Sequence, residues 1–294
     1  MSMLNTIGNT PLKQIGGIWC KLEMANPTGS IKDRIAHQMI LAANVPKGGT
    51  IVEATSGNTG VSIAFVAACL GLKSIIYCPF GTTQQKIQLM LSYGAAVHDQ
   101  YDDGLSEHTY APIHSIEQAQ YFAKLCAKIT NNTYYLDQFS NKSNLKAQIN
   151  MATEIKQFLT KDYVNMCFNT PSWDIKVFHS YFPDCIVAGT GTGGTLAGLH
   201  AVFPDADVYQ VLPKDGQSIE GIADGVDTPL LKGIDFKTIK IDEEIARATA
   251  IMLCKKYGVN CGTSSGGNYA AAMSLKKKYD NIVTVFSDAG WRYK

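Results

Sequence analysis

Short apolar runs alternate along this chain with longer segments in which apolar residues recur every three to four positions. A short apolar run between turn residues is typical of a buried strand, whereas the longer periodicity is typical of a helix with one buried face. The sequence therefore predicts strands over residues 18–22, 51–54, 74–78, 95–98, 185–188, 208–212 and 282–286. It predicts helices over residues 30–44, 59–70, 83–93, 116–129, 144–158, 243–257 and 265–279, and one more that ends near residue 202.

Alternation of strands and helices favours an α/β fold with mostly parallel sheets covered by helices on both faces. Two helix starts carry capping signals: Thr82 with Gln85 predicts a capping box, and Asp242 predicts an N-cap. The acidic stretch 101–107 predicts an exposed loop. Residues 161–184 form the least regular stretch, which we interpret as a surface excursion or a lid.

Composition narrows the classes of protein. The 294 residues are 46% hydrophobic and 17% charged, which fits a compact chain large enough for two lobes. A net charge of +1 gives no electrostatic footprint for nucleic acid or an anionic membrane. We see no secretion signal, no membrane-length apolar run and no Cys/His cluster with metal-ligand spacing. The eight scattered cysteines suggest buried reduced thiols, so we expect a cytoplasmic protein without a bound metal.

The first chemical signal is Lys32, which follows a Pro/Gly-containing turn over residues 26–31 at a predicted helix start. A lysine held at the end of an element and partly desolvated can lose its proton and act as a nucleophile or a base. Most lysines at such a place are simply solvated. Taken alone, this segment therefore favours the structural interpretation.

The second signal is the run of small residues over 55–60, between a predicted strand and a predicted helix. Glycines and short hydroxyl side chains leave backbone N–H groups open, and the helix adds the positive end of its dipole, which suits a carboxylate or a phosphate. A third run, 189–195, follows another strand and suits a phosphate. A fourth, 262–267, precedes an Ala-rich helix and by itself indicates only an N-cap.

The third run also contains G-x-G-x-x-G at Gly189, Gly191 and Gly194, which leaves a nicotinamide-dependent dehydrogenase open. A dinucleotide-binding fold requires an acidic residue at the end of the next strand, and Asp215 lies close to the end of the predicted strand 208–212. The dinucleotide hypothesis explains neither Lys32 nor the loop 55–60, so it is the weaker alternative.

With the four motifs in this order, the chain resembles the β-replacement family of pyridoxal-phosphate enzymes, the fold-type II group with cysteine synthase (O-acetylserine sulfhydrylase) and cystathionine β-synthase. The resemblance covers nearly the whole chain and rests on residues 6–12, 26–34, 53–60, 138–141, 189–198, 221–222, 262–266, 287–288 and 292–293. It implies two three-layer αβα lobes like those of the tryptophan synthase β chain. The smaller, mobile lobe would be 35–146, and the larger 1–34 plus 147–294, with the cofactor in the cleft between them.

The resemblance also implies site residues. Lys32 would hold pyridoxal 5'-phosphate as a Schiff base and then act as the catalytic base at Cα. The cofactor phosphate would be bound by the loop residues Gly191, Thr192, Gly193, Gly194 and Thr195. Asn58 would bond the ring hydroxyl, and Ser264 would face the pyridine nitrogen. The substrate would be bound by Thr55, Ser56, Thr59, Gln138 and Gly221.

Ser264 has a consequence for reaction choice. A carboxylate beside the pyridine nitrogen would keep it protonated and make the ring a deep electron sink, whereas a neutral hydroxyl leaves the sink weaker. Expulsion of a group from Cβ is then the favoured outcome. We therefore expect β-replacement through an α-aminoacrylate, making L-cysteine from O-acetyl-L-serine and sulfide.

Several alternatives remain open. Cystathionine synthesis, diaminopropionate synthesis and sulfide release from cysteine would use the same residues, and a non-catalytic relative would bind only a partner's tail. Residues 217–231 contain no Arg or Lys, so we rank O-acetylserine above O-phosphoserine as substrate. By family analogy we expect a homodimer, a possible partner in the C-terminal tail of serine acetyltransferase, and closure of about 75–127 over the substrate.

Overall fold

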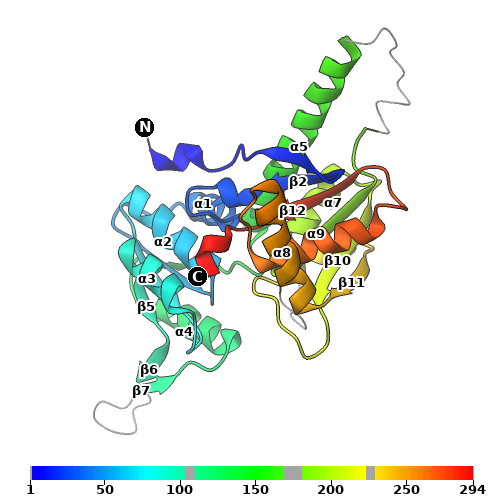
Figure 1. The fold of residues 1–294 in the computed structure, drawn as a ribbon. Helices are drawn as coiled ribbons and strands as arrows, with labels where there is room; N and C mark the ends of the chain where they lie inside the picture. The colour runs from blue at the N-terminus through cyan, green and yellow to red at the C-terminus, as the bar shows by residue number, and fades with distance from the viewer. Residues whose placement is uncertain (1, 103–109, 169–180, 223–228, 294) are drawn as a thin grey trace. The chain divides into compact units, whose positions relative to one another are not determined.

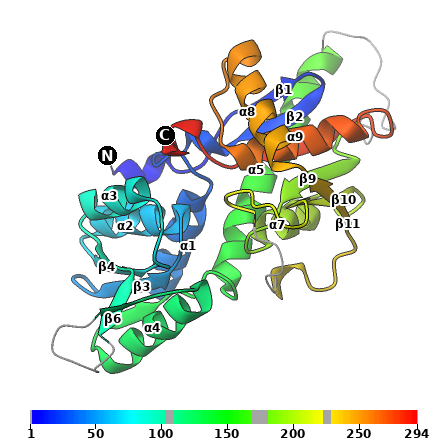
Figure 2. The ribbon, with the colours of Figure 1, turned by 60° about the horizontal axis from the view of Figure 1, so that its bottom comes forward.

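The computed structural model describes residues 2–102, 110–168, 181–222 and 229–293, which divide into two compact units. Unit 1 comprises Met1–Ile7 and Lys32–Asn144, and unit 2 comprises Gly8–Ile31 and Leu145–Lys294. Each unit is a sheet between helices (Figures 1 and 2), so the predicted α/β class with mostly parallel sheets is confirmed. Among the described residues, no helix has the length and apolar character needed to cross a membrane.

Unit 1 contains a parallel sheet in the order β5-β4-β3-β8 and a separate antiparallel ribbon of β6 and β7. Its strands are β3 (Thr50–Ala54), β4 (Lys73–Tyr77), β5 (Ala96–His98), β6 (Gln100–Asp102), β7 (Tyr110–Pro112) and β8 (Thr133–Tyr135). Its helices are α1 (Lys32–Ala43), α2 (Asn58–Leu70), α3 (Gln84–Ser92), α4 (Ile116–Ile129) and the 3₁₀ turn η1 (Met3–Thr6). Val52 and Ala54 pack on the α4 side, where Ala119 and Ala123 leave room for close contact.

Unit 2 contains a six-stranded sheet in the order β1-β2-β12-β9-β10-β11, parallel except for β1. Its strands are β1 (Leu12–Ile15), β2 (Ile18–Leu22), β9 (Cys185–Gly189), β10 (Asp207–Pro213), β11 (Lys237–Ile241) and β12 (Ile282–Phe286). Its helices are α5 (Lys142–Phe168, which starts in unit 1), α7 (Gly194–Val202), α8 (Glu243–Tyr257) and α9 (Thr263–Leu275). Short 3₁₀ turns are η2 (Glu23–Ala25), η3 (Pro229–Leu231) and η4 (Gly290–Tyr293).

The strand periodicity of two builds the layers of unit 2. On β9, Ile186 and Ala188 face the core formed with α5 and α7, whereas Cys185 and Val187 face the core formed with α8 and α9. Both faces of the sheet are therefore covered, which explains why its strands read as continuous apolar runs.

Several local expectations need correction. Helix α3 begins after Thr83, and no side chain caps it; the Thr82 hydroxyl instead donates to the Pro79 carbonyl, so the capping box does not form. The Asp242 cap is confirmed, because its carboxylate accepts the Glu244 N–H. Tyr101 and Asp102 lie in β6 and not in a loop, and the rest of 101–107 lies outside the described residues.

The helix predicted over 144–158 is longer than expected. Helix α5 runs from Lys142 to Phe168, so the first part of the irregular stretch 161–184 is helical. The side chains of Trp19 and Phe158 meet edge to face at 6.1 Å between ring centroids, and Leu159 lies in the core. Residues 169–180 lie outside the described part of the chain.

Candidate active site

Lys32 is the first residue of α1, and the two residues before it are fixed by backbone bonds. Ser30 forms an antiparallel bridge with Asp288, and the Ile31 N–H donates to the Ser287 carbonyl at 2.8 Å. The helix therefore begins two residues later than the sequence predicts, because Ser30 and Ile31 pair with another segment. This pairing sets the point at which the chain turns into Lys32.

The turn before Lys32 is held from inside unit 2 as well. The Asn26 amide donates to the Glu23 carboxylate at 2.8 Å and accepts the Gly8 N–H at 2.9 Å. Glu23 is fully buried and also accepts from the Thr10 hydroxyl. The Arg292 guanidinium, 2% exposed, donates to the Thr28 carbonyl. Because polar groups hold both ends of the turn, its conformation is specified well beyond the requirements of a surface loop.

The loop over residues 55–60 joins β3 to α2 in unit 1. Thr55 is buried, and its hydroxyl accepts the Gly57 N–H at 3.1 Å. Asn58 opens the helix and is partly exposed, as is Gly57, while Ser56 is exposed. A Cβ atom added to Gly57 would lie 3.7 Å from the Nζ of Lys86, a lysine that is 1% exposed. A cation and a helix N-terminus thus flank the loop, an arrangement that favours an anion.

Gln138 lies beside this loop, although 79 positions separate it from Thr59. The Thr59 hydroxyl donates to Oε1 of Gln138 at 2.8 Å, and Nε2 of Gln138 donates to the Ala54 carbonyl at 3.0 Å. Gln138 is 4% exposed. Four of the five predicted substrate residues, Thr55, Ser56, Thr59 and Gln138, therefore belong to unit 1, and the loop and Gln138 are joined by hydrogen bonds.

The glycine-rich loop of unit 2 runs from the end of β9 into α7. Gly193 is the N-cap and has φ +82°, a left-handed conformation that a glycine adopts at little cost. A Cβ on Gly191 would lie 3.4 Å from the Gly221 carbonyl. The Thr190 hydroxyl is buried and has no hydrogen-bond partner in the described part of the chain. The loop thus combines small residues, a helix N-terminus and an unsatisfied hydroxyl.

Ser264 and Gly221 lie near this loop. Ser264 is the second residue of α9 and is 4% exposed, and a Cβ on Gly221 would lie 3.8 Å from its hydroxyl oxygen. No carboxylate stands at the Ser264 position. Unit 2 therefore brings together a phosphate-type loop and a neutral hydroxyl, and these residues fit a phosphate-bearing cofactor whose ring nitrogen meets an alcohol.

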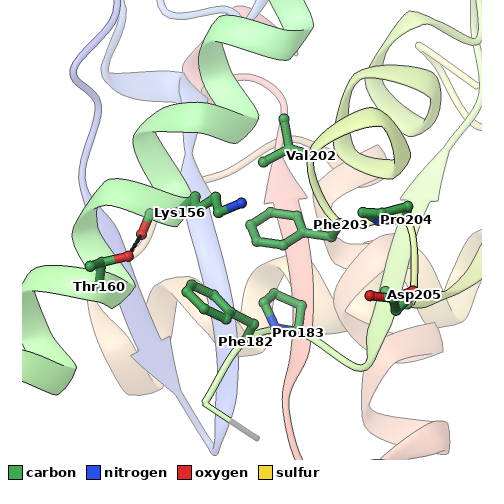
Figure 3. Close-up of a pocket in the computed structure, with 9 residues that line it drawn as sticks. Lys156, Thr160, Phe182, Pro183, Val202, Phe203, Pro204 and Asp205 are labelled. Atoms are coloured by element: carbon green, nitrogen blue, oxygen red, sulfur yellow. Dashed lines mark hydrogen bonds between the residues drawn. The ribbon is translucent and has the colours of Figure 1, made fainter. Parts of the chain in front are cut away.

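A cavity of about 390 Å³ at the other end of α7 contains none of the predicted site residues (Figure 3). It is lined by Lys156, Thr160, Phe182, Pro183, Val202, Phe203, Pro204, Asp205 and Ala206. The Lys156 ammonium lies 5.9 Å from the Phe182 ring centroid. Since α7 separates this cavity from the glycine-rich loop, the cavity is not part of the candidate site.

A family model for pyridoxal-phosphate dependent enzymes matches residues 3–288. The chain belongs to this family. The probable cysteine synthase of Bacillus subtilis is 32% identical, over 98% of this chain and 94% of the relative. The cystathionine β-synthase of Apis mellifera is 33% identical over 94% of this chain, which spans only 56% of that relative's length.

Solved structures agree with this family. An O-acetylserine dependent cystathionine β-synthase from Helicobacter pylori has a TM-score of 0.82 and 27% identity, with 100% of this chain and 96% of that chain covered. A hydrogen sulfide-producing enzyme from Fusobacterium nucleatum has a TM-score of 0.82 and 28% identity, with 100% and 99% covered. The predicted membership in the cysteine synthase and cystathionine β-synthase group, and the pyridoxal phosphate dependence of this enzyme, are therefore confirmed.

Family membership also argues against the dinucleotide-binding alternative for the glycine-rich loop. The acid that this alternative needs is Asp215, whose side chain is 82% exposed and forms an ion pair with Lys240. It thus lies in solvent after β10, where a surface pair accounts for it.

Sequence reasoning missed two residues that shape the site. Asn268, 1% exposed, accepts the Gly189 N–H at 2.7 Å and donates to the Val285 carbonyl at 3.0 Å, so it holds the start of the glycine-rich loop. Ser265 accepts the Ser287 N–H at 3.0 Å. A signal was available for Asn268, because it lies one helical turn after Ser264 on an otherwise small and apolar helix.

Proposed function

We propose that this pyridoxal-phosphate enzyme makes L-cysteine from O-acetyl-L-serine and sulfide by replacing the group on Cβ. The observation that carries the proposal is the buried Ser264 beside the glycine-rich loop, a neutral hydroxyl at the position where a carboxylate would keep a cofactor nitrogen protonated. Cysteine synthases among the relatives support the same reaction.

The bound cofactor supplies an electron-withdrawing ring that acidifies Cα of the substrate. Lys32 would hold it through its amine, and this amine would then take the proton from Cα. The loop Gly191–Thr195 would bind the phosphate through backbone N–H groups and the helix dipole. Asn58 would donate to the ring hydroxyl, and Ser264 would meet the ring nitrogen.

Substrate recognition would rest on unit 1. Thr55, Ser56 and Thr59 would hold the α-carboxylate, with the dipole of α2 and the nearby Lys86 favouring the negative charge. Gln138 would complete this site, and Gly221 would leave room for the substrate side chain. Glu220 and the absence of Arg and Lys over 217–231 favour an acetyl over a phosphoryl leaving group.

A second candidate is sulfide release from cysteine, which would use the same residues. The observation that favours it is the likeness to the hydrogen sulfide-producing enzyme of Fusobacterium nucleatum, which covers the whole chain. The two candidates differ in the substrate consumed and not in the cofactor site.

One experiment separates them. Purified enzyme is incubated with O-acetylserine, O-phosphoserine, serine or cysteine, each with sulfide or homocysteine, and the products are identified by mass. We expect cysteine from O-acetylserine and sulfide. If cysteine alone is consumed, the second candidate replaces the first. If O-acetylserine reacts with homocysteine to give cystathionine but does not react with sulfide, the nucleophile assignment is wrong.

For the assembly we propose a homodimer, supported by analogy with the family alone. The C-terminal tail of serine acetyltransferase is a candidate partner for the substrate site on the same ground. Sedimentation of the purified enzyme, with and without a tail peptide, tests both.

A further inference from the structure

Glu53, the fourth residue of β3, is a fully buried carboxyl group that the proposed chemistry does not use. Burying an ionisable group is costly unless hydrogen bonds compensate. Its Oε1 accepts the Ala54 N–H at 2.8 Å, and its Oε2 accepts the Gln138 N–H at 3.1 Å. Both donors are main-chain groups at the two segments of the proposed carboxylate site.

Ala54 directly precedes the loop 55–60, and its carbonyl accepts from the Gln138 side chain at 3.0 Å. That side chain in turn accepts from Thr59 at 2.8 Å. Glu53 thus closes a ring of hydrogen bonds that joins the end of β3, the loop and Gln138. Glu53 lies outside the loop and accepts one hydrogen bond from the end of β3 and one from the segment that contains Gln138.

We propose that Glu53 is a positioning residue for the substrate carboxylate, acting by fixing the main chain of Gln138 against the start of the loop 55–60. The inference rests on the proposed function, because it assigns the carboxylate to these residues. Without an acceptor at position 53, the N–H groups of Ala54 and Gln138 would be buried and unpaired, and Gln138 would shift to find another partner.

The groups around Glu53 support a structural role for its carboxyl group. Burial is the largest cause and raises the pKa of Glu53 to about 8, although the hydrogen bonds from the Ala54 and Gln138 N–H groups lower it. The charge of Asp137 also raises this pKa, and that of Lys124 lowers it. A glutamine at position 53 keeps the shape of the side chain but offers one acceptor oxygen, because its NH2 group cannot accept, so it can pair only one of the two main-chain N–H groups.

The test compares Glu53→Leu, Glu53→Gln and the wild-type holoenzyme, with Ser74→Ala as the matched control. Ser74 is also buried in the sheet of unit 1, at the opposite end of the strands. We expect Glu53→Leu to raise KM for O-acetylserine about tenfold or more with a smaller change in kcat, since the loss falls on substrate binding. The cofactor absorption spectrum should be unchanged. Glu53→Gln, which keeps one acceptor, should raise KM less than Glu53→Leu does, and Ser74→Ala should keep KM near the wild-type value.

An unchanged KM in Glu53→Leu overturns the inference, as does an equal rise of KM in Ser74→Ala. If Glu53→Leu does not fold, Glu53→Asp replaces it, because one methylene less prevents the carboxyl group from reaching both donors. Its KM should rise severalfold, and a wild-type KM in this variant also overturns the inference. Wild-type enzyme that binds no amino acid at all would instead refute the proposed function.

Discussion

The buried carboxyl group of Glu53 should make the stability of this protein depend on pH. Burial raises its pKa in the folded state from an ordinary value of 4.5 to about 8. Between these two values the unfolded chain ionises the group while the folded protein keeps it protonated. The contribution of Glu53 to stability is therefore fully present below pH 4.5 and is lost as the pH rises to about 8.

The size of the effect follows from the same pKa. Each pH unit in this range costs about 1.36 kcal/mol, so the interval from pH 5 to pH 8 corresponds to a loss on the order of 4 kcal/mol from this one group. A loss of this size is a large fraction of the stability of an ordinary domain. Glu53→Gln removes the titration and should remove this contribution.

Urea unfolding at pH 5, 6, 7 and 8, followed by circular dichroism with saturating cofactor, measures the difference directly. Comparing the two proteins at each pH cancels every other titrating group. We expect the stability of Glu53→Gln relative to the wild type to increase from pH 5 to pH 8, on top of a pH-independent loss from the one hydrogen bond that glutamine cannot accept. The decline should extend to higher pH in Lys124→Ala, which lacks the cation that lowers the pKa of Glu53. A difference that stays constant with pH refutes the reasoning, and so does a wild type that gains relative stability as the pH rises.

Two further predictions concern the cofactor and the packing of α9. Borohydride treatment of the holoenzyme should leave the mass of the cofactor on a peptide that contains Lys32. The Lys32→Ala variant should lose this adduct, and its turnover should fall by about 10²-fold or more. Exposed Lys47 is the control lysine, and full turnover in Lys32→Ala refutes the role of Lys32. Gly266→Ala should lower the free energy of unfolding by about 1–3 kcal/mol or more, because its Cβ would lie 2.1 Å from the Ala246 carbonyl oxygen and 2.8 Å from the Ala250 nitrogen. The neighbouring Gly267→Ala, whose Cβ would meet nothing closer than 3.4 Å, should be neutral or stabilising by about 0.5–1 kcal/mol in urea unfolding, and equal losses in both variants contradict this packing argument.

Local sequence patterns predicted the central parallel strands well because buried strands carry their own signal, whereas the short strands β1, β6, β7 and β8 were not predicted. The runs 185–188 and 282–286 agree with β9 and β12 to within one residue, since both faces of the sheet need apolar side chains. By contrast, β11 (Lys237–Ile241) was not predicted. This edge strand contains two lysines, one threonine and only two apolar residues, and none of its side chains is fully buried, so it has no apolar run to mark it.

Helix starts were harder to place where distant segments compete for the backbone. Ser30 and Ile31 pair with the C-terminal segment, so α1 begins only at Lys32, and no pattern near residue 30 reports that pairing. The capping box predicted at Thr82 does not form for a related reason: the Thr82 hydroxyl donates to the Pro79 carbonyl within the preceding turn.

The candidate site shows the same division between local and distant causes. Small residues over 55–60 and 189–195 could be read from the sequence, because a backbone that must approach an anion needs them at consecutive positions. The roles of Glu53 and Asn268 could not be read in this way, since each holds a main-chain N–H group that lies 85 or 79 positions away, respectively. Their buried polar atoms are explained only by the partners that folding brings to them. Residues that would contact the ligand thus form local motifs that the sequence shows. Each residue that holds those motifs in place appears in the sequence only as a single polar residue.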